Sequence, residues 1–203
     1  MDRARLFFAL PVDPPVRDAL GVLAEDVAHR AQGRAVAAAN LHMTLAFLGS
    51  VACACLPLLE EVGARCARSL VDAAPLAVTL DRLGSFRGAR VAWIGGSEVP
   101  QPLRSLQSAL VHALANGGFA VDERPWKAHV TLARHCRLPP RAAMHPALQL
   151  PVRALALYES VSAAGGPRYE ALARWPSGGE RSSSTPLSTG RVGSATHSLH
   201  DPG

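Results

Sequence analysis

The stretch His42-Met-Thr-Leu-Ala46 returns almost unchanged at residues 129–133, as His-Val-Thr-Leu-Ala. Each copy has the composition of a β-strand and follows a stretch with helical periodicity. Successive side chains of a strand point to opposite faces, so His42 and Thr44 share one face while the residues between them pack behind. A fragment repeated in matching contexts predicts two similar lobes related by an approximate twofold axis.

The second copy pairs His129 with Thr131 in the same way. Two such strands side by side would place two histidines around one small ligand, which suits the cleavage of a cyclic phosphodiester. One imidazole can take the proton of the attacking water and the other can protonate the departing oxygen near neutral pH. The two threonine hydroxyls can donate to the phosphate oxygens. Side chains therefore handle protons and charge, and the sequence predicts no metal and no cofactor.

Outward from the motif, strands and helices mix without regular alternation, which favours an α+β fold over a doubly wound sheet. Residues 135–151 are rich in proline and are predicted to be a connection without regular structure. Strands are predicted at 5–10, 41–49, 76–84, 90–96 and 128–134 and as a closing hairpin of 152–160 with 168–175, and helices at 16–30, 56–70 and 103–114.

The chain has 203 residues, which suits one domain of ordinary size or two small lobes sharing a core. Its net charge of +5 is compatible with an anionic partner. No segment has the roughly 18 apolar residues needed to span a membrane. The four cysteines match no zinc spacing, so free thiols in a cytoplasmic protein are expected. Residues 1–176 are predicted to form a single bilobal catalytic domain, and 177–203, rich in Ser, Gly and Pro, a disordered tail.

Several stretches together resemble the two-histidine (2H) phosphoesterases, in particular bacterial RNA 2′,3′-cyclic phosphodiesterases, formerly called 2′-5′ RNA ligases. The resemblance implies two pseudo-twofold-related lobes with antiparallel sheets lining a central groove. It also implies hydrolysis of an RNA-terminal 2′,3′-cyclic phosphate to a 2′-phosphomonoester, with His42 as acid and His129 as base. The stretches that carry it are RLFFAL (5–10), LHMTLAFLG (41–49), GSFRGARVAWIG (84–95), ERPWKAHVTLAR (123–134) and LYES (157–160).

The two copies differ five residues after the histidine, where the first has Phe47 and the second Arg134. The resemblance implies that Arg134 contacts the phosphate. Strict alternation would place Arg134 on the face opposite His129, so the strand must end, twist or bulge for the guanidinium to reach the site. Phe47 could stack on a nucleobase, as aromatic side chains do at single-stranded nucleic-acid sites, but a core position is favoured for it. A groove-wall position is considered for Arg90, Trp93 and Trp126, with packing favoured for both tryptophans.

Other functions remain open on the sequence alone. The same chemistry would serve a linear 2′-5′ oligonucleotide, an ADP-ribose cyclic phosphate or another small cyclic diester, and 2′-5′ RNA ligation is the reverse of such a cleavage. A non-catalytic module that binds RNA ends is an alternative of a different class. The expected partners are RNA 3′ ends or nucleotides with a 2′,3′-cyclic phosphate, no membrane is expected, and the protein is expected to be a monomer.

Overall fold

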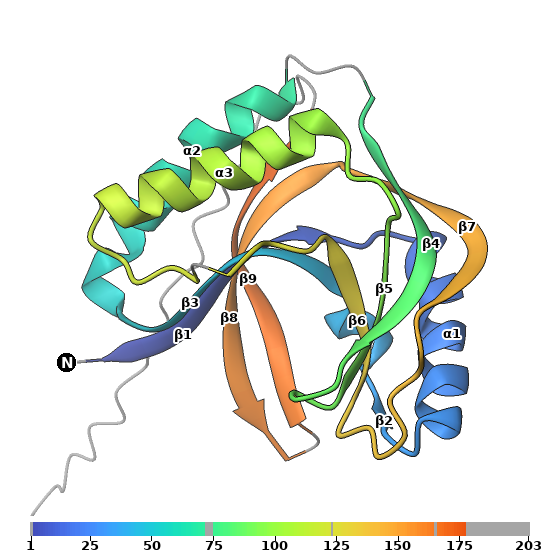
Figure 1. Cartoon of the computed structure of the whole chain (residues 1–203). Helices are drawn as coiled ribbons and strands as arrows, with labels where there is room; N and C mark the ends of the chain where they lie inside the picture. The colour runs from blue at the N-terminus through green and yellow to red at the C-terminus, as the bar shows by residue number, and fades with distance from the viewer. Residues whose placement is uncertain (1, 72–74, 123, 165, 178–203) are drawn as a thin grey trace, which may run out of the picture.

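The computed structural model describes residues 2–71, 75–122, 124–164 and 166–177. Its strands are joined in the order β7-β4-β5-β6-β3-β1-β8-β9, with β2 added beside β6, and the recorded pairs are antiparallel (Figure 1). The strands are β1 (Arg3–Pro11), β2 (Arg34–Ala35), β3 (His42–Ala52), β4 (Ala77–Phe86), β5 (Val91–Gly95), β6 (His129–Arg134), β7 (Ala143–Pro151), β8 (Ala154–Ala163) and β9 (Gly166–Pro176). The helices are α1 (Val16–Arg30), α2 (Leu56–Val71) and α3 (Gln101–Asn116), and single 3-10 turns cover Ala38–Asn40 and Cys53–Cys55.

The sheet consists of two lobes of matching design. Strands β3, β1, β8 and β9 form the first lobe, and β6, β5, β4 and β7 form the second. The lobes meet where β3 pairs with β6, and the recorded partners are Met43 and Val130. These two residues hold the same position in their motifs, so the approximate twofold axis passes between them. The predicted α+β fold with two pseudo-twofold-related lobes is confirmed.

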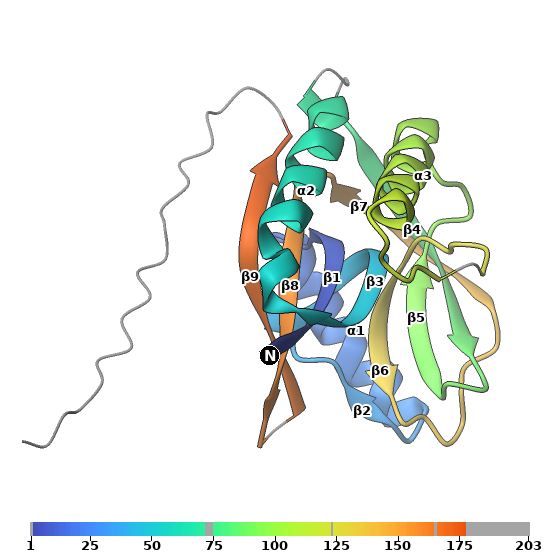
Figure 2. The ribbon, with the colours of Figure 1, turned by 90° about the vertical axis from the view of Figure 1, so that its left-hand side faces the viewer.

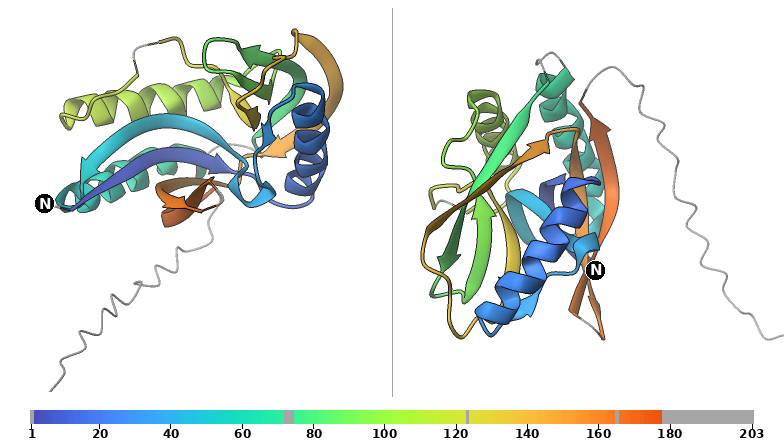
Figure 3. Two further views of the ribbon diagram at one scale, coloured as in Figure 1. Left: turned by 90° about the horizontal axis from the view of Figure 1, so that it is seen from below. Right: turned by 90° about the vertical axis from the view of Figure 1, so that its right-hand side faces the viewer.

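Helices α1 and α3 hold the two lobes together, because each packs on a strand of the opposite lobe. Helix α1 follows β1 of the first lobe but packs on β6 and β2 (Figure 3). Helix α3 precedes β6 of the second lobe but contacts β3, and α2 lies against α3, β8 and β9 (Figure 2). One apolar stripe of α3 supplies fully buried side chains at three- and four-residue steps, each contributing about 1.5–3 kcal/mol. They are Leu103, Leu106, Leu110 and Leu114.

The predicted elements all occur, with ends shifted by a few residues, but the prediction for 135–151 was wrong. Residues 143–151 form strand β7, which pairs with β4. This strand lies at the edge of the sheet, where a proline such as Pro146 breaks no ladder of hydrogen bonds on the open side. The apolar residues Leu148 and Leu150 then pair with Leu80 and Val78 of β4.

Three further expectations concern the whole chain. No helix in the described part of the chain is long and apolar enough to cross a membrane. Cys53, Cys55, Cys66 and Cys136 are all free thiols, and the last two are buried. Apart from Ser177, which hydrogen-bonds to Val152 and Arg153, the predicted tail lies outside the described residues.

Candidate active site

The two motif strands have the same order of buried and exposed positions. In residues 42–47 the histidine and the threonine are partly exposed, the other three motif residues are buried and the sixth residue is exposed. Residues 129–134 repeat this pattern position by position. The predicted separation between an apolar anchoring side and a polar presenting side is therefore present in both lobes.

The register between β3 and β6 brings the two motifs to one point. Because Met43 stands opposite Val130 in an antiparallel pair, His42 runs alongside Thr131, and Thr44 runs alongside His129. The four polar side chains project from the same face, since each lies one residue from this buried pair. Each histidine is thus set beside the threonine of the other copy.

A β-bulge follows the threonine in both copies. The pairing of β3 with β1 skips Leu45, and the pairing of β6 with β5 skips Leu132. The carbonyl oxygen of Leu45 accepts a hydrogen bond from Gln107 Nε2 (3.3 Å), and that of Leu132 accepts one from the amide of Val36 (2.8 Å). In each case the donor comes from a segment that connects strands of the opposite lobe. The second lobe therefore stabilises the bulge of the first lobe, and the first lobe stabilises the bulge of the second.

The bulges decide where the sixth motif residue points. An extra residue reverses the alternation, so Phe47 and Arg134 return to the face of the histidines and threonines. Arg134 therefore reaches the site through the bulge that its predicted role required. The prediction that Phe47 belongs to the core was wrong: its side chain is 46% exposed and lines a cavity together with Arg134.

This active-site cavity has a volume of about 550 Å³ and lies between the motif strands and the β8–β9 hairpin. Three of the predicted site residues line it, namely His42, Thr44 and Arg134. His129 and Thr131 do not line the cavity but stand next to it across the β3–β6 pair. The hairpin contributes Ser160, Ser162 and Tyr169, and β1 contributes Arg5 and Phe7.

Both histidines are held in the same tautomer. The Nδ1–H of His42 donates to the carbonyl oxygen of Asn40, and that of His129 donates to the carbonyl of Lys127, each at 2.7 Å. A carbonyl can only accept, so Nδ1 carries the proton and Nε2 is left for chemistry. In its neutral form, Nε2 of His42 accepts from the hydroxyl of Thr44 at 3.1 Å.

The surroundings of His42 are aromatic. Its ring centroid lies 4.8 Å from that of Phe7 and 5.0 Å from that of Tyr169, which meets it edge-on. Burial lowers the pKa of His42 to about 4; the Asn40 carbonyl opposes this change, while the charges of Arg134 and His129 add to it. At neutral pH His42 is thus a neutral imidazole.

His129 has fewer aromatic neighbours and more cations. The edge of its ring meets Phe86 with the centroids 5.0 Å apart, and Trp93 lies at 6.2 Å. Burial lowers its pKa below the ordinary value of 6.5; the backbone hydrogen bond to Lys127 opposes this, and the charges of Lys127 and Arg134 lower it further. The charge of Arg134 thus lowers the pKa of both histidines.

With this geometry established, sequence comparison identifies the family. The profile of the 2′-5′ RNA ligase superfamily matches residues 13–162, well over half of the chain. The chain belongs to this superfamily. The fold, the paired motifs and the bulges described above are therefore those of a 2′-5′ RNA ligase superfamily member.

Two relatives within the superfamily carry the same name. The RNA 2′,3′-cyclic phosphodiesterase of Escherichia coli is 32% identical over 175 residues, covering 84% of this chain and 95% of the relative. That of Archaeoglobus fulgidus is 30% identical over 180 residues, covering 83% and 97%. The crystal structure of E. coli LigT complexed with 3′-AMP superposes with a TM-score of 0.74 at 29% identity, covering 87% of this chain and 99% of LigT.

Three side chains considered for the groove wall take different positions. Trp126 donates its indole N–H to the carbonyl of Thr44 at 2.9 Å, so this residue of the second lobe fixes the backbone of the first. Trp93 is only 3% exposed and packs beside His129. Arg90 does not line the active-site cavity. Its guanidinium donates hydrogen bonds to the carbonyl oxygens of His135 and Cys136 and so stabilises the turn after Arg134.

Sequence reasoning missed the residues that surround and orient the histidines. Phe7, Tyr158 and Tyr169 are brought to His42 by strand pairings across distant parts of the chain. The first two lie in stretches that carry the family resemblance, RLFFAL and LYES, but nothing in those stretches marks them as neighbours of His42. Asn40 and Lys127, each two residues before its histidine, orient the imidazoles through backbone carbonyls, so their side-chain types give no signal. Among the described residues, no group of three or more His, Cys, Asp or Glu side chains could hold a metal ion.

Proposed function

We propose that this protein hydrolyses the 2′,3′-cyclic phosphate at an RNA end to a 2′-phosphomonoester. The observation that carries the proposal is the β3–β6 register, which puts the two His-Thr pairs side by side, next to the cavity lined by His42, Thr44 and Arg134. Two relatives covered over nearly their whole length are named RNA 2′,3′-cyclic phosphodiesterases, which supports the same chemistry here.

In the proposed reaction, water attacks phosphorus as His129 Nε2 removes its proton. The bond from phosphorus to the ribose 3′ oxygen breaks, and His42 delivers a proton from Nε2 to that oxygen. Thr44, Thr131 and Arg134 donate hydrogen bonds to the non-bridging oxygens, where charge grows in the transition state. The product keeps its phosphate on the 2′ oxygen, and the histidines end with their protonation states exchanged.

The lowered pKa values bear on the protonation that each role requires. A pKa below 6.5 leaves His129 mostly neutral at pH 7, as a base must be. His42 must be protonated to act as acid, although burial lowers its pKa to about 4. A cyclic phosphate is an anion, and its charge beside Nε2 favours the imidazolium form. Substrate binding thus helps to protonate the acid.

The proposal takes residues 1–176 as a single bilobal catalytic domain, active as a monomer in the cytoplasm. The cross-packing of α1 and α3 supports one domain, because neither lobe has its own complete set of helix contacts. Four unpaired thiols suit a reducing compartment. A chain truncated after Ser177 should keep full activity and melting temperature, since this residue carries the last described hydrogen bonds to the fold.

The test is turnover of a nucleoside 2′,3′-cyclic phosphate in excess EDTA, with the product followed by ³¹P NMR. The expected product is the 2′-phosphate, formed at the same rate with and without the chelator. A 3′-phosphate product would overturn the bond assignment, and loss of activity in EDTA would overturn the metal-free mechanism. Binding without turnover would favour an RNA-end binding module instead.

A further inference from the structure

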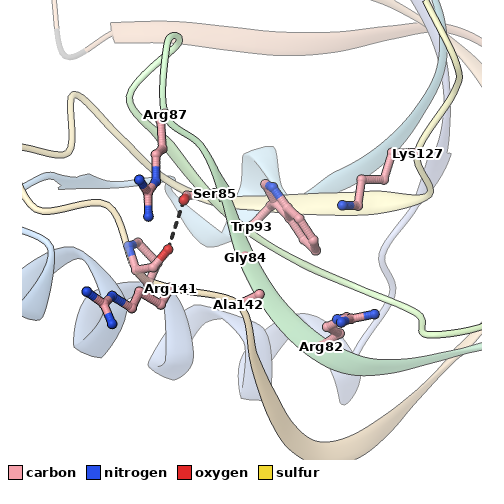
Figure 4. A pocket seen from close by; sticks show the side chains of 9 residues that line it. Arg82, Gly84, Ser85, Arg87, Trp93, Lys127, Arg141 and Ala142 are labelled. Carbon is pink, nitrogen blue, oxygen red and sulfur yellow. Dashed lines mark hydrogen bonds between the residues drawn. The ribbon is translucent and has the colours of Figure 1, made fainter.

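A second cavity, of about 580 Å³, opens beside Trp93 on strands β4 and β5 (Figure 4). Its lining has a single sign of charge: it contains several cationic side chains, and no Asp or Glu is among them. We refer to it as the arginine cavity. The cations are Arg82, Arg87, Lys127 and Arg141.

The arginine cavity lies on the same face of the sheet as the candidate active site. Trp93 pairs with Thr131 of the second motif and with Gly84 of β4, and paired residues share a face. Arg82 is two residues from Gly84 and so lies on that face as well. The centre of the Trp93 ring lies 6.2 Å from the centre of the His129 ring, so this indole separates the two sites.

Local packing builds the floor of this cavity. A Cβ atom on Gly84 would come within 2.3 Å of the Trp93 ring, so only glycine lets the indole lie flat against β4. Lys127 Nζ sits 4.0 Å above the centre of the same ring. Since Trp93 is 3% exposed and covered in this way, it offers no open aromatic face to a nucleobase.

The charges of the cavity form no ion pair with a carboxylate in the described part of the chain. Within the described ranges, none of the four cationic side chains forms an ion pair or donates a side-chain hydrogen bond to another residue. Other exposed arginines, such as Arg124 and Arg174, pair with aspartates. Like charges gathered without a counter-ion repel one another, so the arrangement is favourable only when an anion joins it.

We propose that the arginine cavity binds phosphodiester groups of the RNA strand that precede the terminal nucleotide, so that the preferred substrate is an oligonucleotide. This inference rests on the proposed function. Guanidinium groups can bond two phosphate oxygens at once, and the cavity begins one aromatic ring away from His129. Because Trp93 offers no open aromatic face for a nucleobase to stack on, the cavity recognises the charge of the RNA backbone. It therefore adds little preference for base sequence.

The experiment compares two substrates with the same reactive end, a cyclic mononucleotide and a single-stranded RNA of about ten nucleotides ending in a 2′,3′-cyclic phosphate. The variant Arg82→Gln/Arg87→Gln/Arg141→Gln removes three cavity charges and leaves Lys127 beside His129 in place. The control Arg65→Gln/Arg68→Gln/Arg104→Gln removes three exposed charges on α2 and α3 that line neither site. Circular dichroism checks that both variants fold.

For the cavity variant, KM for the RNA should rise by about ten- to a hundredfold, because three phosphate contacts are lost. The log–log dependence of RNA affinity on salt should flatten by about 2, at roughly 0.7 per contact for a single strand. Mononucleotide kinetics should stay within twofold of the wild type, and the control variant should behave as wild type on both substrates.

The inference is overturned if the cavity variant raises KM equally for both substrates or for neither, or if the control variant matches it. Failure of the wild-type protein to turn over the cyclic mononucleotide would instead count against the proposed function. The two failures are thus distinguishable in one set of measurements.

Discussion

The first motif, residues 42–47, and the second, residues 129–134, have similar backbone geometry but different surrounding side chains. Both have the same order of buried and exposed positions, and both bulge after the threonine. Around His42, however, stand Phe7, Tyr158 and Tyr169, whereas His129 has Lys127 and the arginine cavity nearby. Symmetry of the fold therefore sets the geometry, while the unsymmetrical neighbours set the charge and polarity.

This difference shows how one repeated strand can supply two catalytic roles. A base and an acid must hold their protons differently, and two identical environments would give two identical pKa values. Here burial among aromatic rings lowers the pKa of His42 to about 4, while His129 sits beside cations that a phosphate can neutralise. The sixth motif residue extends the contrast with Phe47 on one side and Arg134 on the other.

The largest expected effect comes from removing either histidine. His42→Ala and His129→Ala should each lower kcat on a cyclic mononucleotide by about a thousandfold, the usual scale of acid–base catalysis. The double variant should lose little more, since one proton transfer without the other is of small use. His112→Ala, at an exposed position on α3, is the matched control. A large loss in only one of the single variants would break the symmetry on which the account rests.

The next effect compares the sixth residues of the two motifs, Phe47 and Arg134. Arg134→Ala should lower kcat/KM by about a hundredfold, because a charged donor to the phosphate is lost. Phe47→Ala should cost less than about fivefold, since burial of part of one apolar contact is its main contribution. Steady-state kinetics on the same mononucleotide measure both. Equal losses would mean that the two positions act alike and that Arg134 has no special contact with phosphate.

Sequence alone located the groups that precede the bulges, whereas of the two groups that follow them it named Arg134 through the family resemblance and misplaced Phe47. His42, Thr44, His129 and Thr131 obey the two-residue period of a strand, so their common face was predictable. Phe47 was misplaced because nothing in Leu-Ala reveals an extra residue in the pairing, and the position of Arg134 could be stated only as a condition. The register of two strands is a long-range property that one local pattern does not contain.

The same distinction holds for the fold. Strands and helices with clear apolar periods were predicted close to their observed bounds, because burial of one face enforces the period. Strand β7 was missed because prolines, which usually interrupt strands, are tolerated at a sheet edge. The β8–β9 hairpin was predicted, but the aromatic residues around His42 also depend on the pairing of β1 with β8, which no local pattern specifies.

The smallest expected effect is on the pH at which kcat/KM is greatest, which should lie below the ordinary histidine pKa of 6.5. In the free protein, both histidines are protonated below about pH 4 and no base remains, whereas above the lowered pKa of His129 both are neutral and no acid remains. The optimum of kcat/KM should therefore lie between about 4 and 6.5, whichever histidine is the acid. An optimum above pH 7.5 would show that burial does not control these groups. Tyr169→Ala, which opens the surroundings of His42, should move the acidic limb upward.

The central claim is that both histidines face one phosphate, and NMR of the two imidazole side chains tests it most directly. Nucleoside 2′-phosphate, the proposed product, is titrated into the protein while the ring signals of His42 and His129 are followed. The account predicts that both signals shift along one binding curve and that the pKa of His42 rises from about 4 when the phosphate is bound. A response from only one histidine, or two separate binding curves, would contradict a shared site.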